Sequence, residues 1–157
     1  MPADDFHTRP FDEGTLTKLQ IFELYAREWL PVFLSNPTRP EIHIFDFFAG
    51  PGQDVRGELG SPLRLLRQLG SFTHFSGWSK VSMHAHFFDA SPRKIAQLRK
   101  AIDQSGLCPN GVTLDVQVLE FQEAIPKYQT TLAKAQAAKL LLIDQTGVDQ
   151  EIGRAHV

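Results

Sequence analysis

The sequence contains a single cysteine, Cys108, among its 157 residues. A disulfide within the chain is therefore impossible, and this is typical of proteins from a reducing compartment. Long hydrophobic runs are also missing, because the longest aliphatic stretch, Leu140–Ile143, is far too short to span a bilayer. The first residues lack the basic and then apolar pattern of a signal peptide. We therefore expect a cytoplasmic protein without a membrane segment.

The sequence also lacks a large excess of charge of either sign. The chain carries 16 basic and 18 acidic side chains, for a net charge of −2. This balance gives no overall basic footprint for nucleic acid, although it leaves room for a local basic patch. At this length we expect one domain or part of one.

Apolar residues recur with helical spacing from Thr15 to Leu34, and Pro31 predicts a kink or break in that helix. Beyond the turn-rich connector at 36–40, short apolar runs alternate with further helical segments. The predicted strands are 41–48, 81–88, 112–119 and 139–144. The predicted helices are 61–69, capped by Ser61, then 91–106, and 121–138 with an interruption at Pro126. This alternation indicates a doubly wound parallel sheet.

The first predicted strand stops abruptly in Phe48-Ala49-Gly50-Pro51-Gly52. Glycine permits positive φ angles and lets another molecule come close to the bare backbone. In α/β sheets, a turn of this kind after the first strand forms part of a ligand crevice. An ordinary strand-to-loop stop is the alternative. The sequence therefore predicts a ligand site at residues 48–52.

The residues around this turn narrow the choice of ligand. Val55 stands where a dinucleotide fingerprint needs its third glycine, and no lysine of a phosphate loop follows before Lys80. Pro51 removes a backbone N–H from any phosphate cradle. Asp46 adds negative charge, which repels phosphate and attracts an amino or sulfonium group. These features favour S-adenosylmethionine.

Acidic residues end or follow the other predicted strands. Asp89 is placed to accept hydrogen bonds from ribose hydroxyls, or else to cap the next helix. Glu120 is placed to meet the adenine edge, or else to act as an acid in the first helical turn. Asp144 follows the fourth strand, where a methyltransferase presents polar groups to its substrate, but Asp144-Gln-Thr-Gly147 is also an ordinary turn sequence. We take Asp144 as the candidate catalytic residue.

Two further patterns receive simpler interpretations. His84 and His86 have a spacing found in metal sites, but the sequence shows no accompanying ligand cluster, so we expect no metal. The side chains of four basic residues are expected on the solvated side of their helix, namely Arg93, Lys94, Arg99 and Lys100.

The last seven residues, 151–157, back-translate readily into the start of a common sequencing adapter. We therefore expect native sequence to end near Gln150. The expected organisation is a helical segment at 1–40, a partial domain at 41–150, and this non-native tail.

Taken together, the motifs resemble the three-Cys-motif partner protein family (TcmP). They are Lys18-Leu-Gln-Ile21 with Tyr25 and Trp29, Asp46-Phe-Phe-Ala-Gly-Pro-Gly52, Gly60-Ser-Pro62, and Asp144-Gln-Thr-Gly147. The resemblance spans about residues 15–150 and corresponds to the N-terminal part of the family's domain. It implies a Rossmann-like S-adenosylmethionine methyltransferase fold with an N-terminal helix, truncated after strand four.

The resemblance also implies roles and a partner. Asp46, Gly50 and Gly52 would contact the methionine end of the cofactor, and Asp89 its ribose. The protein would be encoded beside a phage-type, cysteine-motif partner protein, in a phage-associated or defence gene pair. A fragment ending after strand four would be inactive, with its last strand exposed as an apolar edge.

Two alternatives stay open. One is a non-catalytic subunit with a methyltransferase-like fold, which docks a partner through the aromatic face of its first helix. The other is a DNA methyltransferase. The latter ranks lower, because the chain has neither a Pro-Cys nucleophile nor an Asp-Pro-Pro-Tyr tetrad.

Overall fold

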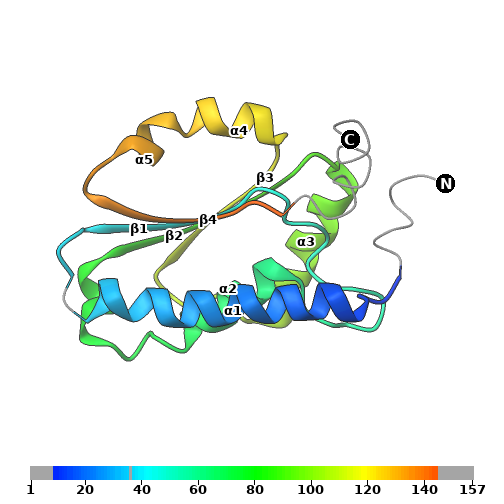
Figure 1. Cartoon of the computed structure of the whole chain (residues 1–157), viewed down its shortest axis with the longest axis horizontal. Helices are drawn as coiled ribbons and strands as arrows, with labels where there is room; N and C mark the ends of the chain where they lie inside the picture. Colours follow the sequence, from blue (N-terminus) through cyan, green and yellow to red (C-terminus); the bar gives the residue numbers. More distant parts are fainter. Residues whose placement is uncertain (1–8, 36, 145–157) are drawn as a thin grey trace.

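The computed structural model describes residues 9–35 and 37–144. At its centre is a four-stranded parallel sheet with the strand order β3-β2-β1-β4. Helices α4 and α5 lie on one face, and α1, α2 and α3 lie on the other (Figure 1). In chain order the elements are α1 (Glu13–Leu34), β1 (Glu41–Asp46), α2 (Ser61–Gly70), η2 (Ser76–Lys80), β2 (Ser82–Asp89), α3 (Pro92–Ser105), β3 (Val112–Val118), α4 (Phe121–Lys127), α5 (Gln129–Ala133) and β4 (Ala137–Leu142).

The strand order confirms the predicted fold class. The chain moves outward from β1 through β2 to β3, and then returns across the sheet to β4 on the other side of β1. Doubly wound α/β sheets begin in this order, and they bind ligands at the carboxyl ends of the strands where the order reverses. Here the order reverses at β1, whose carboxyl end lies between those of β2 and β4.

Alternation along the strands gives each face of the sheet its own core. Ile42 and Ile44 of β1 pack on the side of α1, α2 and α3, in one cluster with Leu30 and Leu66. Phe45 packs on the opposite side, under α4, together with Phe47, Phe88 and Ala124. Because Leu30 of α1 shares the first cluster, helix α1 is packed into the same body as the sheet.

A buried ion pair fastens α1 to α2. Glu23 of α1 accepts a hydrogen bond from Arg64 at 3.3 Å and from Arg67 at 2.9 Å. Gln68 donates to the same carboxylate at 2.7 Å. The first of these bonds pairs Arg64, which is 8% exposed. Burial raises the pKa of Glu23, but the three partners together outweigh this effect and lower it.

Helix α1 ends at Leu34 as predicted, and it runs through Pro31 without a break. Two other predicted boundaries are wrong. Gly60, not Ser61, is the N-cap of α2. The helix predicted to reach residue 138 ends at Ala133, with Pro126 inside its first part, and β4 begins at Ala137.

Among the described residues, no helix combines the length and the apolar character that a membrane crossing requires. Residues 151–157, for which we predicted a non-native origin, lie outside the described part of the chain.

Candidate functional site

The turn after β1 has the backbone that its glycines predict. Gly50 and Gly52 have φ angles of 70° and 93°, which a residue with a side chain adopts only with strain. The N–H of Ala49 donates to the carbonyl of Phe88 at 2.8 Å, which ties the turn to the end of β2. The turn therefore lies across the carboxyl ends of the two central strands.

The space beside Gly52 belongs to α3. A Cβ atom at this position would lie 2.9 Å from Leu98 Cδ1 and 3.3 Å from Ala101 Cβ. Gly52 also accepts a hydrogen bond from the N–H of Gly60 at 2.7 Å. The absence of a side chain at Gly52 thus lets α3 approach the turn, whereas the sequence predicts that this glycine lets a cofactor approach the backbone.

Asp46 is buried at the end of β1. Its carboxylate accepts hydrogen bonds from the Ser61 hydroxyl and, at 3.3 Å, from the N–H of Phe48. Burial raises the pKa of Asp46 from 3.8 to about 7, against the effect of these hydrogen bonds, and the negative charges of Asp144 and Asp89 add to the rise. The hydroxyl of Ser61 therefore serves Asp46 instead of capping α2.

Asp89 links the turn to the start of α3. Its Oδ2 accepts from the N–H of Gly50 at 3.0 Å, and its Oδ1 accepts from the N–H of Ser91 at 2.9 Å. The N-cap of α3 is Ser91, whose hydroxyl accepts from the N–H of Lys94 at 3.2 Å. Asp89 is thus placed between β2 and the glycine turn, and the capping role belongs to its neighbour.

The remaining predicted residues lie around the same edge of the sheet. Asp144 is half-buried and forms an ion pair with Lys18 of α1 at 3.3 Å. Phe48 stacks on Phe121, with ring centroids 5.6 Å apart. Glu120 is exposed at the N-cap position of α4, without a side-chain capping bond. The structure therefore gathers Asp46, the turn, Asp89 and Asp144, and leaves Glu120 at the margin.

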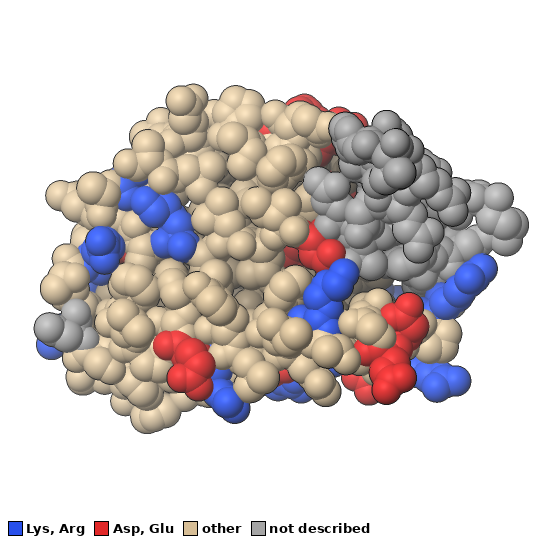
Figure 2. Space-filling model, in the orientation of Figure 1, with Lys and Arg blue, Asp and Glu red and all other residues tan. Residues whose placement is uncertain are grey.

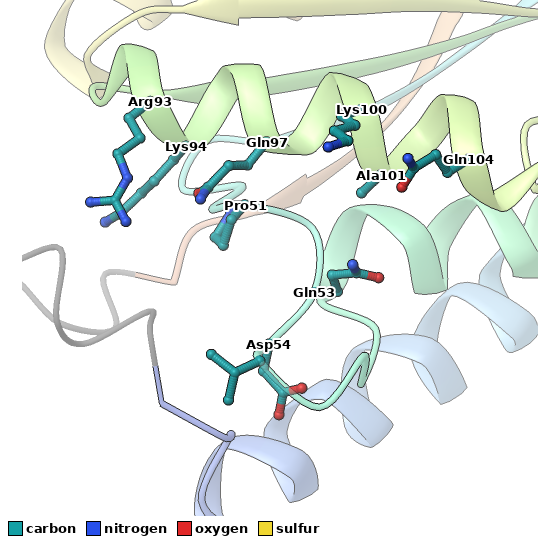
Figure 3. Close-up of a pocket in the computed structure, with 10 residues that line it drawn as sticks. Pro51, Gln53, Asp54, Arg93, Lys94, Gln97, Lys100, Ala101 and Gln104 are labelled. Atoms are coloured by element: carbon teal, nitrogen blue, oxygen red, sulfur yellow. The ribbon is translucent and has the colours of Figure 1, made fainter.

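A hollow of about 300 Å³ lies beside this turn, between the 51–55 loop, which includes Pro51, and α3 (Figure 3). Arg93, Lys94 and Lys100 line it from the helix, so the expectation that they lie on a merely solvated face was incomplete. On the loop side, the carboxylate of Asp54 is occupied by the N–H groups of Phe11, Arg56 and Glu58. The basic lining of this hollow suits an anion better than a cation such as a sulfonium.

Charged side chains do not form one continuous field on the face shown in Figure 2. Lysine and arginine alternate there with aspartate and glutamate, and uncharged surface separates them. The visible part of the described surface therefore lacks the basic stripe that is typical of duplex-binding proteins.

The sequence interpretation missed a polar cluster beneath α4 and α5. His43 of β1 pairs in register with His84 of β2, and Asp115 of β3 pairs with His86. His43 Nδ1 lies 2.8 Å from His86 Nε2, and His86 Nδ1 lies 2.7 Å from Asp115 Oδ2. The polar residues at every second position of β1, β2 and β3 were the available signal, but only the register brings them together.

Burial and hydrogen bonding act in opposite directions on Asp115. Burial raises its pKa, but hydrogen bonds from His86, Gln117 and Tyr128 outweigh this effect and lower the pKa to about 2. Asp115 is therefore a carboxylate at neutral pH. Burial, together with that carboxylate, raises the pKa of Tyr128, which stays a neutral donor.

A parallel sheet in this order, with a glycine turn and carboxylates at the strand ends, defines a doubly wound α/β protein. No model of a known protein family matches the chain, and no curated protein matches it. Among solved structures, TYW2 from M. jannaschii, in complex with AdoMet, is similar at 17% identity with a TM-score of 0.33. The alignment covers 69% of this chain and 35% of the other, so the chain spans about a third of the length of that protein.

Proposed function

We propose that this protein binds S-adenosylmethionine at the carboxyl ends of β1 and β2 as part of a methyltransferase. The observation that carries this proposal is the hydrogen bond from the Gly50 N–H to Asp89 Oδ2, at 3.0 Å. A carboxylate has about four lone-pair positions. The N–H groups of Gly50 and Ser91 use one on each oxygen of Asp89, which leaves an acceptor position on both oxygens for ribose hydroxyls.

The charge of the site supports a cationic ligand. Asp46, Asp89 and Asp144 come close enough that the latter two raise the pKa of Asp46. A sulfonium or ammonium group near these carboxylates would be attracted to them, whereas a phosphate would be repelled. A cationic cofactor would also favour the ionised form of Asp46, so its binding is expected to release a proton near pH 7.

Asp144 is the proposed catalytic residue. It follows β4 beside Asp46, at the point where the strand order reverses, and Lys18 holds its carboxylate by the ion pair at 3.3 Å. Its role would be to orient a methyl acceptor toward the sulfonium, or to take the proton that the acceptor loses. Most of the rate would come from holding the two reactants in line.

The test is calorimetric titration of S-adenosylmethionine into the unchanged chain and into two isosteric variants. Asp89→Asn removes the charged ribose acceptor and is expected to weaken binding about tenfold to a hundredfold, since hydrogen bonds to charged groups contribute about 1.5–3 kcal/mol. Asp103→Asn, at an exposed position of α3, is the matched control and should bind like the unchanged chain. Equal affinity in all three proteins would remove Asp89 from the site, and no binding by any of them would reject the proposal.

The second candidate is a non-catalytic subunit, favoured by the outer face of α1. Ile21, Leu24, Tyr25 and Val32 are 56%, 47%, 58% and 66% exposed there. They recur at helical spacing, and apolar side chains gathered on one exposed face are typical of interaction sites. From the resemblance to the TcmP family, the proposed occupant is the cysteine-motif partner protein.

Co-expression with that partner tests the docking face. The unchanged chain is expected to co-purify with the partner, and Tyr25→Glu should reduce the yield of complex strongly because it buries a charge in an apolar contact. Gln129→Glu, which adds the same charge at an exposed position of α5 on the other face of the sheet, is the control. Equal recovery with Tyr25→Glu would show that this face does not dock the partner.

A further inference from the structure

A row of four hydrogen-bonded polar side chains crosses three strands, from Glu41 at the start of β1 to Asp115 in the middle of β3. Glu41 Oε1 lies 3.1 Å from His43 Nε2, His43 Nδ1 lies 2.8 Å from His86 Nε2, and His86 Nδ1 lies 2.7 Å from Asp115 Oδ2. Both imidazoles are buried, His43 at 5% exposure and His86 at 7%. This cluster lies at the opposite end of β1 from the candidate cofactor site.

The two histidines in this row of side chains have too few N–H groups for the three contacts that they make. Two neutral imidazoles carry two N–H groups, but the three contacts each need one hydrogen. Asp115 already accepts hydrogen bonds from Tyr128 and Gln117, and the second oxygen of Glu41 contacts the Lys134 ammonium group, so both carboxylates are acceptors. When His86 donates to Asp115 and His43 donates to His86, the lone pairs of Glu41 Oε1 and His43 Nε2 face each other. A cation between these two atoms would remove the conflict.

His84 supplies a third donor at the same place. Its ring stacks on that of His43, with centroids 4.4 Å apart and planes 9° from parallel. One ligand atom each from Glu41, His43 and His84 lie within 4.8 Å of one another. A proton shared by Glu41 and His43 would remove the conflict without His84. A metal ion needs a third protein ligand, and His84 is in place to supply it.

We propose that Glu41, His43 and His84 bind a divalent transition-metal ion of the zinc class. Two imidazole nitrogens and a carboxylate oxygen are the donors that such ions take, at about 2.0–2.2 Å, with a fourth position left to water. Glu41 and His84 are only half-buried, so that position opens to solvent. Metal–ligand bonds of this length place tetrahedral donors about 3.4 Å apart. The three donors, which now lie within 4.8 Å of one another, would draw together, and the stacked His43 and His84 rings would tilt so that their nitrogens converge.

His86 and Asp115 would hold the ring of His43 in position for the metal ion. A metal-binding histidine usually donates its other N–H to a second group, which fixes its tautomer and its ring orientation. Here the Nδ1–H of His43 donates to His86 Nε2 at 2.8 Å, and Asp115 fixes His86 in turn. Lys134 opposes binding, because its ammonium group lies against Glu41. Removing that charge should strengthen metal binding.

The test uses Co²⁺ as a spectroscopic probe, added to the full chain after treatment with a chelator. The sequence has six histidines, so stoichiometry alone is not diagnostic and a matched pair of variants is needed. His84→Phe keeps an aromatic ring on the stack and removes the donor, whereas His74→Phe makes the same change at an exposed loop position. Circular dichroism without metal establishes that both variants are folded.

The unchanged chain and His74→Phe are expected to develop the intense visible bands of four-coordinate Co²⁺. His84→Phe should bind at least tenfold more weakly, and Lys134→Gln should bind several-fold more tightly. No visible bands, or equal Co²⁺ affinity in His84→Phe and His74→Phe, would overturn the metal site and leave the proposed cofactor site untouched, since the two lie at opposite ends of β1.

Discussion

Asp46 illustrates how far the surroundings of one side chain can change its chemistry. The residue is 1% exposed, and burial raises its pKa from 3.8 to about 7. From the sequence we predicted that Asp46 adds a negative charge beside the glycine turn. The sequence did not predict that the acid is buried with the Ser61 hydroxyl as its partner, because Gly60-Ser-Pro62 has the pattern of a helix start.

The raised pKa of Asp46 predicts that the protein becomes less stable as pH rises. The folded state keeps this proton up to about pH 7, whereas the unfolded carboxyl group loses it near its ordinary value of 3.8, so the unfolded state gains stability as pH rises between these values. Asp46→Asn keeps the shape without the titration. Its free energy of unfolding should increase relative to that of the unchanged chain by about 2 kcal/mol between pH 5 and pH 8.

Urea unfolding of the two proteins at both pH values measures this difference. A constant gap between their stabilities would contradict the raised pKa of Asp46.

The helices and strands show which parts of the fold can be predicted from sequence. The four strands and their alternation with helices were predictable, because apolar runs bounded by glycine and proline are local signals. The end of α5 was not, because Ala137 and Ala138 are equally compatible with a helix, and only pairing with β1 makes them part of β4. The histidine cluster was not predictable for the same reason, since it depends on the register of β1 and β2.

The glycine turn also has a packing role that its sequence did not indicate. Gly52→Ala should lower the free energy of unfolding by about 2–4 kcal/mol, from a positive φ of 93° and a Cβ that would meet Leu98 at 2.9 Å. Gly57→Ala is the matched control, because its φ is 84° but nothing lies within 4 Å. It should cost about 1–2 kcal/mol, for the backbone alone.

Denaturant unfolding of both variants tests this account of α3. Equal destabilisation would mean that the contact of Gly52 with Leu98 contributes nothing to stability.

Across the protein, the two faces and two ends of the sheet separate the proposed roles. The carboxyl ends of β1, β2 and β4 hold three carboxylates and the glycine turn, and the amino-terminal half of β1 and β2 holds the histidine cluster. The hollow beside α3 is basic, and the outer face of α1 is apolar. The fold class alone would permit many functions, so the choice among them depends on these side chains.

A crystal structure of the protein with S-adenosylmethionine would show whether a cationic adenosyl cofactor binds at the carboxyl ends of β1 and β2. We expect electron density along the Gly50–Gly52 turn, with the ribose hydroxyls donating to both oxygens of Asp89. Density for the cofactor away from Asp89, among Arg93, Lys94 and Lys100, or no density at all, would show that this site is wrong.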